Sequence, residues 1–197
     1  MDAHDFVIGY RSVDSRFPNI DDRYMRREMP FIAAVVAAIK ALAMDNPEAF
    51  REFLQANRQL EFMPVQRLLA WGLQQLAPHS PSEVLEFLTE DARRLVIGTY
   101  HDVHADSNRL IRIVAPYLDD QQIRKLEHAI LCWNRYAFLP DSDAKARLHR
   151  LQWTREHRLR LLRAIPAERM SPSCRQHLTE EERAFPGLQD ADIRSYR

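Results

Sequence analysis

Glycine is scarce in this sequence, with four glycines among 197 residues. That is about 2%, against roughly 7% in average proteins. Sandwiches, barrels and nucleotide-binding sheets need many turns with positive φ, which glycine supplies. The phosphate-binding motifs GxxxxGK[ST] and GxGxxG are also missing, so the familiar glycine-rich nucleotide loops are excluded. The composition therefore predicts an all-α fold.

Cysteine, net charge and long apolar runs are limited as well. Cys132 and Cys174 lie in separate segments without CxxC spacing, which argues against a disulfide scaffold or a zinc finger. We expect Cys132 to be an inert buried thiol. The 28 basic side chains balance 28 acidic ones, so no overall charge draws the chain to nucleic acid or lipid. The most apolar run, residues 31–44, is too short to span a bilayer, and the start has no secretory-signal pattern, so we expect a cytoplasmic protein without membrane association.

Four prolines mark predicted helix starts at a constant spacing. Pro30, Pro47, Pro64 and Pro81 are 17 residues apart, and each opens an apolar periodic segment. Proline suits the first turn of a helix, where its missing N–H costs nothing. Two such helices would form a hairpin of about 34 residues, the period of a helical repeat. The spacing predicts stacked antiparallel helices, a HEAT-like α-solenoid, and coincidence among 11 prolines is the alternative.

Apolar periodicity and capping residues predict the individual helices. The predicted helices cover 47–57, 64–77, a segment from Pro81, 107–115, a segment after Asp119, about 143–165, and a last segment from Ser171-Pro172 to Pro186-Gly187. The predicted N-caps are Asn46, Ser80, Asp106 and Asp119. Residues 91–105 are expected to be less regular, and residues 5–10 are the one run that could form a strand. We predict an irregular N-terminal segment (1–20), a single α-helical repeat domain (21–187) that a polar break near 140 could divide, and a tail (188–197).

A basic segment, Ala144 to Arg169, is the first candidate site, with eight basic residues against two acidic ones. The predicted binding surface consists of Arg147, Arg150, Trp153, Arg155, Arg158 and Arg163. Such a helix could follow a phosphate backbone, with Trp153 stacking on a base. The arginines occupy several faces, however, and a core seam is predicted at Leu148, Leu151, Leu159 and Leu162. Pairing of the arginines with the acidic run Glu180–Glu182 is the favoured interpretation.

A second candidate is the run His101-Asp102-Val103-His104-Ala105-Asp106. Two imidazoles and two carboxylates could bind a divalent metal, whose bound water would act as a hydrolytic nucleophile. The spacing is not HExxH, and a solvated loop before a helix is the favoured interpretation. We expect Glu86 and Glu90 to form an exposed face, and Trp71, Trp133 and Trp153 to pack in the core or between repeats. No catalytic, cofactor-binding or metal-binding residue is therefore assigned.

Two stretches of the C-terminal half carry a resemblance to a known group of proteins. They are LIRIVAPYLDDQQIRKLEHAILCW (residues 110–133) and LLRAIPAERMSPSCRQHLTEEERAFPG (residues 161–187). Within about residues 64–187 the chain resembles the helical-repeat regions attached to large bacterial STAND or NACHT-type ATPases, some of which act in antiphage defence. The ATPase residues of that family have no counterpart here. The resemblance implies recognition of a partner by a repeat surface, as the sensor or accessory part of a defence or signalling system.

The leading hypothesis is a non-enzymatic helical-repeat protein, without a cofactor, that binds a macromolecular partner, favoured to be a protein. One alternative is a nucleic-acid-binding helical protein that uses residues 144–169, such as a helical-repeat DNA glycosylase. Another is a metal-dependent hydrolase at His101 and His104. The sequence leaves the oligomeric state open.

Overall fold

The computed structural model describes residues 30–99, 102–134 and 144–186, and these residues form helices and connecting turns without a strand. The α-helices are α2 (Pro30–Asp45), α3 (Pro47–Asn57), α4 (Met63–Leu76), α5 (Pro81–Glu90), α6 (Ala105–Val114), α7 (Asp120–Cys132), α8 (Ala144–Leu162) and α9 (Pro172–Ala184). Two 3-10 helices, η2 (Ala92–Val96) and η3 (Ala115–Tyr117), lie between them. The all-α prediction is confirmed for this part of the chain.

Local chemistry sets the helix starts, as predicted. The four evenly spaced prolines lie at the beginnings of α2, α3, α4 and α5. The Asn46 side chain accepts the Ala49 N–H at 3.2 Å at the start of α3. Asp119 forms a reciprocal capping box at the start of α7. Ser171 accepts the N–H of Cys174 at 3.2 Å and so caps α9.

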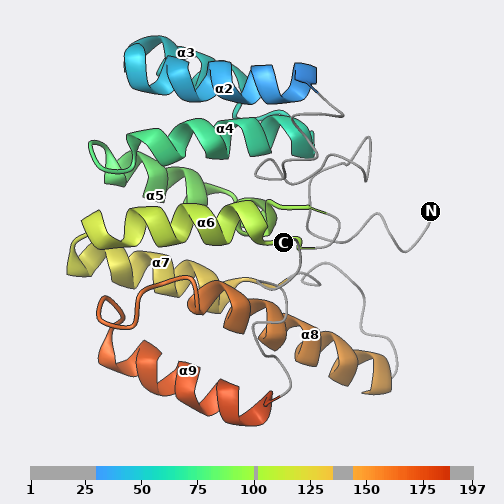
Figure 1. The fold of residues 1–197 in the computed structure, drawn as a ribbon. Coiled ribbons are helices and arrows are strands. Elements are labelled where there is room, and N and C mark those ends of the chain that lie inside the picture. Colours follow the sequence, from blue (N-terminus) through green and yellow to red (C-terminus); the bar gives the residue numbers. More distant parts are fainter. Residues whose placement is uncertain (1–29, 100–101, 135–143, 187–197) are drawn as a thin grey trace.

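The helices are stacked in chain order, from α2 and α3 at the top of Figure 1 to α8 and α9 at the bottom. Helices α2, α4, α6 and α8 contact one another in succession, and α5 contacts α7 beside them. Two ion pairs, Arg51–Glu83 and Arg58–Glu90, join α3 to α5. In each pair the two residues are 32 positions apart in the sequence. A constant offset means that α3 and α5 run in the same direction.

One hydrophobic cluster extends from Ile39 on α2 to Cys174 on α9. Trp71 and Trp133 are each 1% exposed and lie in the core, as predicted. Gly72 allows α3 and α4 to approach closely, because a Cβ atom there would lie 2.1 Å from the Phe50 ring. This close contact explains one of the few glycines in the chain.

Several predictions concern residues outside the described ranges: the irregular segment 1–20 with its strand candidate at 5–10, the polar break at 140–142, the tail at 188–197, and His101. Within the described ranges, none of the helices has the length and hydropathy needed to cross a bilayer.

Candidate functional site

The second half of α8 is part of the stack, and Arg155 on this half and Arg163 just after it pair with acidic residues of α9. Arg155 donates from Nε and Nη2 to the Glu181 carboxylate at 3.0–3.2 Å. Arg163 donates from Nε to Glu182 Oε1 at 3.0 Å. The predicted pairing with this acidic run is confirmed for these two arginines. The guanidinium of Arg155 also stacks on the Phe185 ring, 5.1 Å from its centre.

Arg158 closes the end of the preceding helix. Its Nε donates to the carbonyl oxygen of Trp133 at 2.7 Å, and Trp133 is the C-cap of α7. A cation is stabilised at a helix C-terminus, where carbonyl groups lack intrahelical partners. Burial lowers the pKa of Arg158 below the ordinary guanidinium value. Three of the six predicted binding residues, Arg155, Arg158 and Arg163, therefore hold α8 to α7 and α9.

The first half of α8 projects past the ends of the neighbouring helices (Figure 1). Leu148 is 58% exposed, Leu151 is 54% exposed and Trp153 is 41% exposed. The prediction that Leu148 and Leu151 belong to a core seam is wrong, and so is the core position of Trp153, because this half of α8 extends beyond the packed layer. Leu159 and Leu162, on the same helix, are fully buried as predicted.

The exposed half of α8 combines these apolar side chains with cations. Lys145, Arg147 and Arg150 lie on it, and the helix contains no acidic residue before Glu156. The Trp153 indole N–H donates to Nε2 of His149 at 3.0 Å, one helical turn away. This surface is therefore basic and apolar, and it is distinct from the arginines that are used inside the stack.

His104 is fully buried, and both of its ring nitrogens face polar partners. Its Nδ1 donates to the carbonyl oxygen of Leu95 at 2.7 Å, and its Nε2 faces Nδ1 of His157 at 2.5 Å. The Trp133 ring lies edge-on to both imidazoles, with centroids 6.0 and 5.4 Å away. Within residues 30–99, 102–134 and 144–186, no group of three or more His, Cys, Asp or Glu side chains is placed to hold a metal ion.

Asp106 differs from its predicted role as a helix cap. His104 occupies the N-cap position of α6, and Asp106 lies inside the first turn. Its carboxylate accepts hydrogen bonds from Arg67 Nε at 2.6 Å and from Trp71 Nε1 at 2.7 Å. The Arg67 guanidinium also lies over the Trp71 ring, 5.0 Å from its centre. Two partners on α4 therefore replace the capping role, and the buried carboxylate joins α4 to α6.

The two cysteines lie in opposite environments. Cys132 is exposed, with its Sγ 3.5 Å from Nε2 of His128, so the prediction of a buried thiol is wrong at this position. It lies on the outer side of α7, whereas the inward positions of that helix are held by Ile123, Leu126 and Ile130. Cys174 is the buried thiol, and burial together with the nearby Glu127 raises its pKa to about 12.

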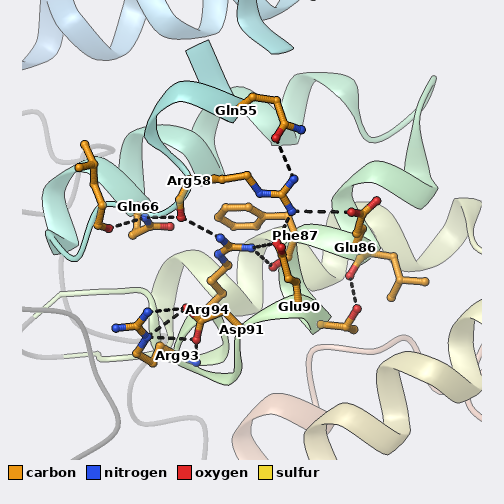
Figure 2. Close-up of polar contacts among 12 residues, drawn as sticks. Gln55, Arg58, Gln66, Glu86, Phe87, Glu90, Asp91, Arg93 and Arg94 are labelled. Atoms are coloured by element: carbon orange, nitrogen blue, oxygen red, sulfur yellow. Dashed lines mark hydrogen bonds and ion pairs between the residues drawn. The ribbon is translucent and has the colours of Figure 1, made fainter. Parts of the chain in front are cut away.

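Sequence reasoning missed a polar network between α3, α5 and η2, which Figure 2 shows. Arg94 is fully buried and donates to Glu90 Oε2 at 2.8 Å, to the Phe87 carbonyl at 3.0 Å and to the Arg58 carbonyl at 2.8 Å. Arg58 also donates to Glu90, and Glu86 lies 3.7 Å from Arg58. The predicted exposed face at Glu86 and Glu90 therefore takes part in ion pairs. The signal in the sequence was the offset of 32 residues between Arg58 and Glu90.

Ser80 also departs from its predicted role as a capping side chain. It occupies the N-cap position of α5, but its side chain makes no capping hydrogen bond. The hydroxyl accepts from Arg51 Nη2 at 3.0 Å instead, while Glu83 accepts from Arg51 Nε at 3.0 Å. Ser80 and Glu83 thus connect α5 to α3.

Comparison of the chain with protein-family models, with curated proteins and with solved structures finds no match.

Proposed function

We propose that this protein is a non-enzymatic helical-repeat protein, a HEAT-like solenoid, that binds an acidic segment of a partner protein through the exposed half of α8. The α8 surface, as we use the term, comprises Arg147, Leu148, Arg150, Leu151 and Trp153. The observation that carries the proposal is the exposure of three large apolar side chains among cations on one projecting helix. Exposed apolar groups of this kind are typical of interaction sites.

The repeat interpretation is supported by the regular offset between layers. Arg51–Glu83, Arg58–Glu90 and Glu61–Arg93 all join residues 32 positions apart. Pro47 and Pro81 open the corresponding helices α3 and α5. Stacked repeats present extended surfaces that serve mainly in binding.

The chemistry of the α8 surface favours a protein partner over nucleic acid. A nucleic-acid interface needs several cations that can reach successive phosphates. Arg155 and Arg163 already contact carboxylates, and Arg158 contacts a backbone carbonyl. The α8 surface combines apolar leucines, a tryptophan and cations, which suits an amphipathic segment that carries Asp or Glu beside its apolar side chains.

Site-directed photo-crosslinking in the native cell tests this proposal. We expect a photoreactive residue at Leu151 to give a protein adduct whose crosslinked peptide is rich in Asp and Glu. The same residue at Gln121, which is exposed on α7, is the matched control and should give no such adduct. Arg147→Glu should reduce the adduct several-fold, and Arg124→Glu, at an exposed position of α7, should leave it unchanged.

Two results would overturn the proposal. One is an adduct at Leu151 that contains RNA or DNA, together with an affinity for oligonucleotides that falls steeply with salt. The other is an adduct that persists unchanged in Arg147→Glu. Turnover of a hydrolysable substrate with a bound metal would contradict the non-enzymatic part of the proposal.

The resemblance to STAND and NACHT-associated repeats suggests where such a partner would be found. The proposal extends to a sensor or accessory role in a bacterial defence or signalling system. It is supported if a P-loop ATPase is encoded beside this chain or fused to it. An isolated gene would count against the role without affecting the α8 surface.

A further inference from the structure

Helix α2 forms one end of the stack and has an uncovered apolar face. It contacts α3 and α4 and buries Val36, Ile39 and Ala43. Its opposite side exposes Phe31, at 79%, and Met44, at 65%. The full set of exposed positions is Pro30, Phe31, Ala34, Ala37, Ala38, Ala41, Met44 and Asp45. We define these eight residues as the α2 face.

The composition of α2 makes this exposure unusual. Only two of its 16 residues, Lys40 and Asp45, are charged, and Lys40 does not belong to the α2 face. A surface helix of a globular protein carries polar residues on its outer side, and a helix that is apolar all round is ordinarily buried. Terminal helices of a stack need a polar outer face for solubility. The described part of the chain places no helix against the α2 face, so another element is expected to cover it.

The order of residues on the α2 face matches a second copy of itself. The exposed positions are symmetric about the midpoint between Ala37 and Ala38. Phe31 mirrors Met44, and Ala34 mirrors Ala41. In an antiparallel pair related by a two-fold axis at that midpoint, every exposed residue of one copy lies opposite an exposed residue of the other. A two-fold interface requires this self-complementarity.

The sizes of the paired side chains fit the same arrangement. Alanines occupy the centre, where the two helix axes approach most closely, as small side chains permit. The large side chains lie at both ends, where Phe31 of each copy meets the thioether of Met44 of the other. Sulfur and aromatic rings make favourable contacts.

Charge complementarity at the ends points to the antiparallel direction. Asp45 is the residue that mirrors Pro30, so its carboxylate would lie beside the N-terminal turn of the other copy. That turn has N–H groups without intrahelical partners and carries a positive partial charge. The first turn of α2 contains no acidic residue of its own. We propose that the α2 face is the interface of a two-fold symmetric homodimer in which two α2 helices pack antiparallel.

The size of the α2 face sets the expected strength. A 16-residue helix is about 24 Å long and about 10 Å wide. Its contact area is therefore well below the roughly 800 Å² that each partner buries in a standard interface. The dimer is accordingly weak and dissociates on dilution, and it leaves the α8 surface, at the other end of the stack, accessible.

Sedimentation velocity over a wide range of concentration tests the interface with the full chain. We expect a monomer–dimer equilibrium that Ala38→Glu weakens by about tenfold or more, because two carboxylates then face each other across the axis. Ala56→Glu is the matched control, since Ala56 is exposed on α3, and it should leave the equilibrium unchanged. A chain that stays monomeric at all concentrations, or a dimer insensitive to Ala38→Glu, would overturn the proposal.

Disulfide crosslinking tests the register independently of stability. The variants Ala34→Cys and Ala41→Cys, both made with Cys132→Ser, should crosslink when mixed and not when each is oxidised alone. Like positions lie seven residues apart along the antiparallel pair, about 10 Å, which exceeds the Cα separation that a disulfide spans. Equal crosslinking in the unmixed samples would contradict the register. A monomer whose Ala38→Cys thiol resists alkylation would show that residues of the same chain cover the face, and would overturn the dimer.

Discussion

Arg67 on α4 and Asp106 on α6 form an ion pair at 2.6 Å, and their side chains are only 1% and 4% exposed. Removing both charges from water is costly, and the cost is offset because Trp71 donates a second hydrogen bond to the same carboxylate. Gln74 is also buried on α4. The pair therefore fixes the position of α6 against α4.

We predict that Asp106→Ala destabilises the protein by about 3–5 kcal/mol, because it leaves the Arg67 guanidinium buried without its anion. Chemical denaturation followed by circular dichroism measures this change. The double variant Arg67→Met with Asp106→Leu should lose less than the single variant, because no unpaired charge remains. A loss below about 1 kcal/mol for Asp106→Ala would mean that the pair contributes little.

The Glu90 carboxylate provides a prediction about pH. The hydrogen bond from Arg94 is the largest cause that lowers the pKa of Glu90, and Arg58 adds to it while burial opposes. A lowered pKa in the folded state means that the folded protein binds this proton less readily than the unfolded chain. Its stabilisation is therefore present above the ordinary carboxyl pKa and is lost as the pH falls through the lowered one.

Glu90→Gln should cost about 1 kcal/mol at neutral pH, a modest value because Glu90 is 39% exposed and partly screened by water. The difference between wild type and Glu90→Gln should disappear in acid, which urea titrations at several pH values measure. Glu86→Gln is the control, since Glu86 is 64% exposed and 3.7 Å from Arg58. A difference for Glu90→Gln that does not change with pH would contradict the ion-pair explanation.

Local chemistry in the sequence predicted most of the helices. A proline or a capping side chain acts within about one turn of a helix start. The caps at Asn46 and Asp119 therefore follow from their neighbours in the sequence, and so does the start of α9 at Ser171-Pro172.

The candidate sites depended on partners far away in the sequence. From its neighbours in the sequence, Asp106 is predicted to be a helix cap. Its actual partner, Arg67, lies 39 residues earlier and is brought beside it only by the fold. Leu148 and Leu162 lie on the same side of α8, and which of them is buried depends on how far the packed layer extends. The burial of Cys174 and the exposure of Cys132 have the same origin, because both lie on amphipathic helices and the neighbouring elements decide which side is covered.

Gly72 supports a prediction about packing. A Cβ at this position would lie 2.1 and 2.3 Å from two atoms of the Phe50 ring, and Phe50 is fully buried. Helix propensity alone favours alanine over glycine, so the expected loss of stability in Gly72→Ala isolates the steric contact between α3 and α4. We expect a loss of about 1–3 kcal/mol by thermal or chemical denaturation.

A compensating substitution identifies the clash as its cause. Phe50→Leu removes the ring and should make Gly72→Ala less costly than it is in the wild-type background, which a double-mutant cycle measures. Gly72→Ala that stabilises the protein with Phe50 in place would show that α3 and α4 can separate at no cost.

The two cysteines give the last prediction, on reactivity and alkaline pH. Because Cys132 is exposed and Cys174 is 3% exposed, iodoacetamide should label Cys132 in the native protein and reach Cys174 only after unfolding.

The pKa of Cys174 is raised to about 12, so the folded protein keeps a thiol proton that the unfolded chain loses above about pH 8.5. This contribution to stability is present at neutral pH and declines as the pH rises between these values. The stability difference between wild type and Cys174→Ala should therefore shrink by about 1.4 kcal/mol per pH unit above about pH 9, and a difference that stays constant over this range would contradict the assignment.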